Sequence, residues 1–323
     1  MLFEEGYFQL DDPIANFIPA FDNAAVFVDE TETGYETVKA QRPIKIRDLF
    51  THTSGIGLGA GDGSAVEALY TQRVDELKQR GVTLQQAVEG LAEFPLAHQP
   101  GSAWTYGLSY EVLAYLVEIL SGDWFDVFLR ERLCKPLGMT DTAYLVAPGS
   151  EDRLATLYQP TASGNIDVLE TSDDSPHVLP PGFTYESGTG WTSGSGMLVS
   201  TAIDYARFAT MLLNGGELEG VRLLSPKTVQ MMTFNHLPAG MVPFAHVGYG
   251  HGLGVRVLMD VAQSGALGSP GTFAGDGGHG TFFWADPQEE LIGLCMIQLN
   301  HSPHPLFQQL QTLTYQALID MSR

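Results

Sequence analysis

The sequence predicts an α+β fold in which a helical lobe precedes an antiparallel sheet flanked by helices. Apolar residues recur at helical spacing from Val112 to Leu120, whereas residues 281–298 hold two apolar runs separated by the turn-forming stretch DPQEE. We expect residues 1–323 to form a single two-lobed domain. The lobes are expected at about 12–180 (helical) and at about 181–323 together with 1–11 (sheet).

The helices of the first half are indicated by their expected ends. Residues 65–94 have the pattern of helices and follow a glycine-rich loop at 55–63. Ser109 is the expected N-cap of the next helix and Gly122 its expected stop. Asp123 is expected to cap the helix that follows.

The second half begins after a polar, proline-bearing segment at 167–181, which marks a loop or lobe boundary. TAID at 201–204 fits a capping box for a helix that ends at NGG, residues 214–216. One strand is expected at 249–259 and a hairpin at 281–298. A last helix is expected to bury the face made of Phe307, Leu310, Leu313, Ala317 and Met321.

The chain is strongly acidic. Its 16 Lys and Arg and 38 Asp and Glu residues give a formal net charge of −22, so we expect no nucleic-acid and no membrane partner. Cys134 and Cys295 cannot form a disulfide framework and are expected to be small buried hydrophobes. The longest apolar stretch, 291–299, is too short to cross a bilayer, and the start has no basic n-region. The chain as given is therefore expected to be cytoplasmic.

Several common active-site motifs are excluded. GLSYE at 107–111 has Glu where the Gly-x-Ser-x-Gly elbow of an α/β-hydrolase needs its last Gly. GDGGHG at 275–280 spells a dinucleotide fingerprint, but an apolar strand follows it where the fingerprint needs a helix. The nine His residues form no H-E-x-x-H motif. We therefore expect neither a metal nor any other cofactor.

Six motifs in chain order resemble the serine hydrolases of the class C β-lactamase and family VIII carboxylesterase group, in the penicillin-binding-protein-like superfamily. The matching stretches are LDDPI at 10–14, IRDLFTHTSG at 46–55, PGSAWTY at 100–106, STAIDYARF at 200–208 with LLNGG at 212–216, LSP at 224–226 and TFFWADP at 281–287. The resemblance implies a β-lactamase/transpeptidase-like fold with an all-helical lobe. It also implies hydrolysis of a small ester or lactam through an acyl-enzyme.

The resemblance assigns the proton-handling tyrosine of the Ser-Lys-Tyr set to Tyr106. This residue stands just before a predicted helix, whose dipole favours partial phenolate character. The Gly278 N–H is a candidate oxyanion donor. His52 is expected to brace its loop rather than to titrate. The expected substrate-binding residues are Gly107, Leu108, Gly275, Gly277, Gly278 and His279.

Three departures from the family pattern change the expected chemistry. No Ser is followed by Lys three residues on, so the Ser-x-x-Lys nucleophile and base are absent from these 323 residues, and Ser225 has its Lys one position too early. Leu108 replaces the Asn of the Tyr-x-Asn motif of β-lactamases, which favours simple esters. Gly275 stands where relatives carry Lys, His or Trp.

The first six residues, MLFEEG, have the pattern of the last turns of a helix with Gly6 as its stop. We expect a preceding segment that carries Ser-x-x-Lys and the first strands of the sheet to be missing. Its loss would leave this chain inactive. A secretion signal could also lie in the missing segment, so the cytoplasmic expectation holds only for the chain as given. One hypothesis is a truncated carboxylesterase, and another is an active site completed by a second chain. The third is a catalytically dead binding or scaffold module with a leftover acyl cleft. A β-lactamase or acyl transferase relative is the other enzymatic interpretation.

Loss of such a segment would uncover apolar surface on the strand at 291–298 and on the last helix. We therefore predict that the purified chain forms a homodimer or a larger homo-oligomer in light scattering. A monodisperse monomer would contradict this expectation.

Overall fold

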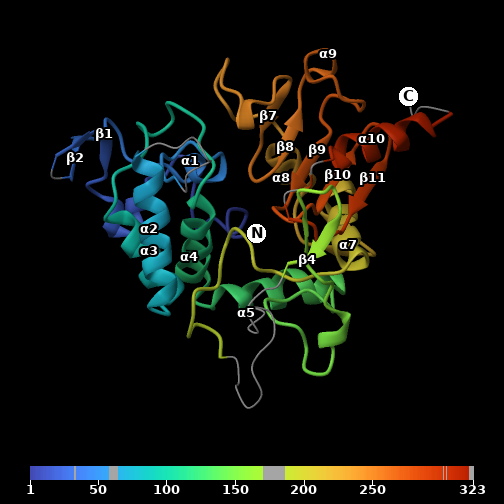
Figure 1. Ribbon diagram of the computed structural model, residues 1–323, viewed down its shortest axis with the longest axis horizontal. Helices are drawn as coiled ribbons and strands as arrows, with labels where there is room; N and C mark the ends of the chain where they lie inside the picture. Colours follow the sequence, from blue (N-terminus) through green and yellow to red (C-terminus); the bar gives the residue numbers. More distant parts are fainter. Residues whose placement is uncertain (33, 58–64, 170–185, 301, 303, 320–323) are drawn as a thin grey trace. The chain divides into compact units, whose positions relative to one another are not determined.

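The computed structural model describes residues 1–32, 34–57, 65–169, 186–300, 302 and 304–319, and it divides into two compact units (Figure 1). Unit 1 comprises Met1–Leu129, Glu186–Gly196 and His236–Ala245; unit 2 comprises Arg130–Tyr185, Met197–Asn235 and His246–Arg323. The predicted α+β class is confirmed, because helices dominate unit 1 and an antiparallel sheet forms the centre of unit 2. The polar segment predicted as a boundary at 167–181 lies largely outside the described residues.

Unit 1 contains the helices predicted at 65–94 as α2 and α3, and it also contains a β-hairpin. The prediction of an all-helical lobe is therefore wrong. All residues of the second hairpin strand are exposed, so this strand has no apolar face that the sequence could show. The elements are η1 Ile14–Asn16, η2 Pro19–Phe21, β1 Ala25–Thr31, β2 Gly34–Lys39, α1 Ile46–Phe50, α2 Ala65–Gln79, α3 Leu84–Ala92, α4 Ser109–Ser121, α5 Phe125–Leu129 and η5 Pro243–Ala245.

The ends of α4 and α5 partly follow the sequence prediction. Gly122 stops α4 with φ +76°, as predicted. The N-cap position belongs to Leu108 and not to Ser109, whose hydroxyl instead forms a 2.8 Å hydrogen bond with the Ser54 hydroxyl in the core. Asp123 does not cap α5, because the Phe125 N–H at its start donates to a carboxylate oxygen of Glu118 at 3.0 Å.

Five strands form the sheet of unit 2 in the order β11-β10-β9-β8-β7, and all neighbours are antiparallel. The hairpin predicted at 281–298 is confirmed as β10 and β11. The single strand predicted at 249–259 is wrong, because the Gly252 N–H donates to the Val255 carbonyl at 2.7 Å and turns the chain back. The strands are β7 Tyr249–His251, β8 Arg256–Leu258, β9 Phe273–Asp276, β10 Phe282–Asp286 and β11 Leu291–Cys295.

The helices of unit 2 include α7, whose N-cap is Thr201 as predicted and whose C-cap is Asn214. The capping box is only half formed. The Thr201 hydroxyl accepts the Asp204 N–H at 3.2 Å, but the Asp204 carboxylate accepts from the Asp141 N–H and the Thr142 hydroxyl instead. The remaining elements are η3 Arg130–Cys134, α6 Lys135–Leu137, η4 Glu151–Arg153, β3 Tyr158–Pro160, β4 Ile166–Val168, α7 Ala202–Leu213, β5 Glu217–Leu218, β6 Val221–Arg222, α8 Pro226–Met232, α9 Val261–Ser264 and α10 Leu306–Gln316.

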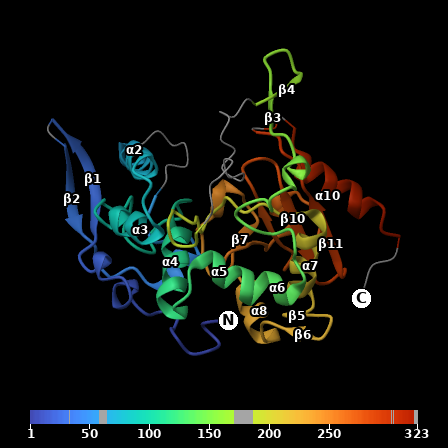
Figure 2. The same ribbon diagram turned by 90° about the horizontal axis from the view of Figure 1, so that it is seen from below.

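Two helices cover opposite faces of the sheet, as Figure 2 shows for α10 and α7 around β10 and β11. Side chains alternate along β10. The rings of Phe282 and Trp284 lie 5.0 and 5.9 Å from Phe307 of α10, whereas Phe283 lies 5.2 Å from Tyr205 of α7. The fully buried Trp284 is therefore the centre of the layer between the sheet and α10.

The buried face of α10 is rotated from the predicted one. Phe307 and Leu310 pack against the sheet as predicted, but Leu313 and Ala317 are exposed, and Met321 lies outside the described residues. The inner positions are instead taken by Gln311, which is 3% exposed, and by Tyr315. Polar groups replace apolar ones there because the Tyr315 hydroxyl donates to a carboxylate oxygen of the fully buried Asp286 at 2.7 Å.

The structure adds three observations on membrane, metal and thiol chemistry. Within the described helices, none is both long and apolar enough to span a bilayer. The described residues contain no group of three or more His, Cys, Asp and Glu side chains that could hold a metal ion. Both cysteines are free thiols; Cys134 is buried, which raises the pKa of its thiol to about 11, and Cys295 is half-buried.

Candidate functional site

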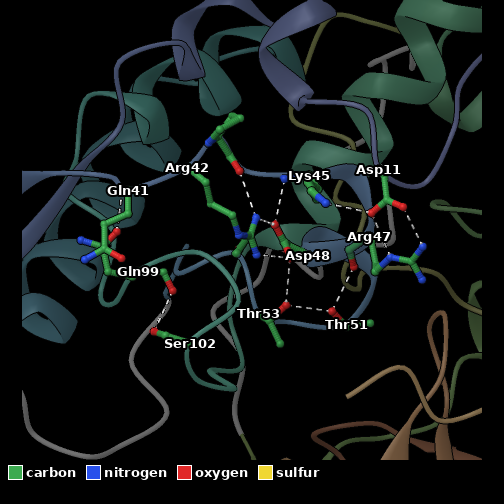
Figure 3. Close-up of polar contacts among 12 residues, drawn as sticks. Asp11, Gln41, Arg42, Lys45, Arg47, Asp48, Thr51, Thr53, Gln99 and Ser102 are labelled. Atoms are coloured by element: carbon green, nitrogen blue, oxygen red, sulfur yellow. Dashed lines mark hydrogen bonds and ion pairs between the residues drawn. The ribbon is translucent and has the colours of Figure 1, made fainter. Parts of the chain in front are cut away.

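Asp48, in α1 of unit 1, gathers donors from three residues around one nearly buried carboxylate (Figure 3). Arg42 binds it through two nitrogens, at 2.6 and 2.9 Å. The Lys45 N–H donates to it at 2.8 Å, and the Thr53 hydroxyl donates at 3.4 Å. The hydrogen bond to Asp48 raises the pKa of the Arg42 guanidinium, which stays charged. The carboxylate therefore ties the chain before α1 to the turn that follows it.

Asp11 forms a second acidic group near α1, on the surface. It pairs with Lys45 at 3.1 Å and with Arg47 at 3.2 Å, and hydrogen bonds from Arg47 and Lys45 lower the pKa of its carboxyl. Its side chain is 61% exposed, so solvent screens these pairs and they add little stability. Asp11 and Asp48 thus both pair with cationic side chains near α1, but only Asp48 is buried.

The backbone that leads to Tyr106 is fastened to the turn after α1. The Gly101 N–H donates to the Thr53 carbonyl at 2.7 Å, and the Thr105 N–H donates to the His52 carbonyl at 2.9 Å. From the sequence, His52 is expected to brace its loop. Its backbone carbonyl does hold Thr105, the residue before Tyr106. These two bonds hold the segment just before Tyr106 against the turn that follows α1.

Two glycines near Tyr106 stand where a Cβ would overlap neighbouring atoms, a side chain at Gly101 and backbone at Gly107. Gly101 has φ +80°, and a Cβ there would stand 2.1 Å from a guanidinium nitrogen of Arg42. A Cβ on Gly107 would stand 2.3 Å from the Ile56 carbonyl oxygen and 2.7 Å from the carbonyl carbon of Gly57. The loop after α1 and the start of α4 are therefore in backbone contact, which only glycine permits.

Aromatic rings surround Tyr106. The His52 ring lies 5.0 Å from the Tyr106 ring and 4.4 Å from the Tyr110 ring. The Phe244 ring lies 5.4 Å from Tyr106 and 4.3 Å from Trp104. His52 and Phe244 both have a left-handed backbone, with φ of 54° and 50°. Such strain in residues other than glycine is concentrated at functional sites.

The two tyrosines of this cluster have different surroundings. The Tyr110 hydroxyl donates to the Phe50 carbonyl at 3.2 Å, and burial raises its pKa, so it stays a neutral phenol. Tyr106 is half-buried and lies three residues before the first residue of α4. The two phenols therefore differ in their place in the fold, since Tyr110 lies within α4 and Tyr106 lies before it.

A second buried carboxylate, Glu111 in the first turn of α4, holds the segment 191–195 against the same helix. It accepts hydrogen bonds from the indole N–H of Trp191 at 2.8 Å and from the Ser193 hydroxyl at 2.7 Å. It also accepts from the N–H groups of Gly194 and Ser195, and from the Ser195 hydroxyl at 2.6 Å. Glu111 is 1% exposed, so these donors compensate a fully desolvated charge. No local pattern marks this residue in the sequence, because its donors lie about eighty positions away.

In unit 2, the predicted glycine-rich residues form the turn between β9 and β10. The Gly277 N–H donates to the Thr281 carbonyl at 2.8 Å, and Gly280 closes the turn with φ +83°. Gly275 is half-buried under the Phe283 ring, which a Cβ would meet at 2.9 Å. Gly275 is therefore a packing position, whereas the turn that follows it is exposed.

Gly278 and His279 form the exposed tip of this turn. A Cβ on Gly278 would meet nothing within 4 Å. Within the described part of the chain, no carbonyl or side chain accepts the N–H of either residue, while the His279 carbonyl accepts the Leu299 N–H at 2.9 Å. The turn thus presents two N–H groups on an anchored backbone.

A cavity of about 430 Å³ lies beside this turn within unit 2. Arg256, which is 7% exposed, lines it between the rings of Tyr249 and Phe307, each 5.3 Å from the guanidinium carbon. Asp276 pairs with Arg256 at 3.7 Å. His246 also lines the cavity, and burial lowers the pKa of its ring.

Comparison with known proteins shows the family to which the chain belongs. A profile described as Beta-lactamase matches residues 1–314. Protein Rv1367c of Mycobacterium tuberculosis is 36% identical over 314 residues, which cover 94% of this chain and 73% of the relative. The chain belongs to the Beta-lactamase family.

Two further relatives of this Beta-lactamase family chain have named activities. Esterase EstB of Burkholderia gladioli is 26% identical over 312 residues, covering 94% of this chain and 73% of the esterase. The solved structure of "EstCE1, a hydrolase with promiscuous acyltransferase activity" superposes with a TM-score of 0.75 at 24% identity, over 97% of this chain and 80% of that one. The β-lactamase/transpeptidase-like fold that the resemblance implied is thereby confirmed.

The residues predicted for the site of this Beta-lactamase family chain fall into two groups. Tyr106, Gly107 and Leu108 are contiguous in unit 1, where Leu108 is 4% exposed and forms the N-cap of α4. Gly275, Gly277, Gly278 and His279 lie together at the β9–β10 turn of unit 2. Sequence reasoning missed Glu111 and Phe244, whose partners come from distant segments of the chain.

The close approach at Gly107 yields a stability test. Gly107→Ala is expected to lower the free energy of unfolding by about 2 kcal/mol or more, because its Cβ would overlap backbone atoms of Ile56 and Gly57. Gly190→Ala is the control, since a Cβ there meets nothing within 4 Å. Urea unfolding followed by circular dichroism measures both. Equal stability of the two variants would contradict the described backbone contact.

Proposed function

We propose that this family member carries the substrate-binding and proton-transfer parts of an acyl-transfer enzyme that acts on carboxylic esters. In this proposal, Tyr106 moves the proton of the attacking group. The observation that carries the proposal is the setting of Tyr106. Its segment is hydrogen-bonded to the turn after α1, and two rings on left-handed backbones contact it.

An ester is favoured over a lactam because of Leu108. β-Lactamases have an Asn there, and an apolar side chain cannot donate to a lactam amide. Leu108 is also buried as the N-cap of α4, so it presents no polar group beside Tyr106. The similarity to Esterase EstB supports the same substrate class.

The 323 residues contain no Ser-x-x-Lys, and their nearest approximation has a structural role. The Ser225 hydroxyl caps α8 by accepting the Thr228 N–H at 3.2 Å, and the Lys227 amine donates to the Gln230 amide oxygen at 2.8 Å. Ser54 and Ser109 are fully buried and bonded to each other. We therefore propose that this chain alone does not complete an acyl-enzyme cycle through a Ser–Lys pair.

A second function follows from the same absence. Without its own Ser–Lys pair, the chain can act as a binding module that holds an ester or another acyl group beside Tyr106 without turning it over. An acyl transferase is the enzymatic alternative, because EstCE1 combines hydrolase with promiscuous acyltransferase activity. For the binding module, we expect the purified chain to bind an ester without turning it over.

The test is hydrolysis of p-nitrophenyl acetate and butyrate by the purified chain and by Tyr106→Phe, each compared with buffer. We expect the two proteins to show equal, background rates, because neither contains the Ser–Lys pair. A Glu111→Gln variant is not suitable as a control here, since that residue supports the same helix. Gly190→Ala is suitable, because that position is open and outside the ring contacts of Tyr106.

Two outcomes would change the proposal. Turnover that Tyr106→Phe abolishes and Gly190→Ala retains would show that another hydroxyl within these residues attacks the ester. Turnover above background that is equal in all three proteins would remove Tyr106 from the chemistry.

A further inference from the structure

A partly exposed aromatic surface lies beside Tyr106 in unit 1. It consists of Trp104, which is half-buried, and Phe244, which is 43% exposed. Their rings are 4.3 Å apart and tilted by 57°, and the Phe244 ring continues to Tyr106 at 5.4 Å. We call these two side chains the Trp104–Phe244 wall. It is continuous with the phenol that the proposed function assigns to proton transfer.

The conformation of Phe244 is not explained by the packing of the core. Its φ of 50° and ψ of 24° are left-handed, which disfavours any residue with a Cβ. A buried ring could offset that cost by removing apolar area from water, but this ring remains nearly half exposed. The strained backbone instead places an accessible ring next to Trp104 and Tyr106.

Charge and chemistry restrict what this surface can hold. The chain has a formal net charge of −22, which disfavours anionic ligands. Aromatic rings attract other rings beyond the effect of buried area, through edge-to-face and offset-stacked contacts. A neutral molecule with an aryl group therefore fits the wall better than an alkyl chain of similar size.

We propose that the Trp104–Phe244 wall binds the aryl part of neutral aryl-bearing esters, and so makes Phe244 a specificity-determining residue beside Tyr106. This inference rests on the proposed ester function, but it concerns binding and needs no turnover. An ester bound in this way places its aryl group on the wall and its acyl carbon toward Tyr106.

The test compares two neutral amides that no esterase step consumes, N-ethylphenylacetamide and N-ethylhexanamide. Dissociation constants are measured by ligand-observed NMR with the full chain. We expect the aryl amide to bind about five-fold more tightly, as a ring–ring contact of ordinary strength predicts. Phe244→Leu should bring the ratio to about one, and Phe244→Tyr should preserve it.

A matched control separates this effect from a general loss of apolar surface. Phe234→Leu changes another exposed aromatic residue, 56% exposed and located in unit 2, and should leave the ratio unchanged. A wild-type ratio near one, or a ratio that Phe244→Leu does not alter, would overturn the inference. Selective binding without hydrolysis of p-nitrophenyl esters would preserve the inference and agree with the proposal that this chain alone does not turn esters over.

Discussion

The arrangement of unit 1 around Tyr106 depends on the buried carboxylate of Asp48. Both oxygens of this carboxylate accept from Arg42, whose guanidinium occupies the space that a side chain on Gly101 would need. Its Oδ1 also accepts from the hydroxyl of Thr53, whose carbonyl accepts the Gly101 N–H. The charge of Asp48 therefore positions two residues, Arg42 and Thr53, that both contact Gly101, at the start of the segment leading to Tyr106. Its low exposure makes the charge costly to leave unpaired.

Glu111 repeats this arrangement in the first turn of α4. Its carboxylate gathers side-chain and backbone donors from 191–195, a segment far away in the sequence. Gly194 allows the contact, because a Cβ there would stand 2.1 Å from the Tyr110 carbonyl oxygen. Two desolvated carboxylates thus fix the two sides of the helix start that follows Tyr106.

Local signals in the sequence were enough to predict much of the fold. Gly122 and Thr201 mark helix ends, the first through its left-handed backbone and the second through the hydrogen bond of its own side chain. Long-range polar contacts were not predictable in this way. Ser109 bonds to Ser54 rather than capping its helix, and Tyr315 faces inward because Asp286 accepts its hydroxyl. Motif similarity located Tyr106, but the rings that surround it come from segments that no spacing rule connects.

The most direct test of this account is to remove the charge of Asp48 while retaining its shape. Asp48→Asn is predicted to lower the free energy of unfolding by about 3 kcal/mol. Hydrogen exchange should also show lost protection of the Gly101 and Thr105 amides. Asp11→Asn, which changes an exposed acid whose cationic partners lie at the same helix, is predicted to change stability by less than about 1 kcal/mol and to leave both amides protected. An Asp48→Asn protein with wild-type stability and protected amides would contradict the account.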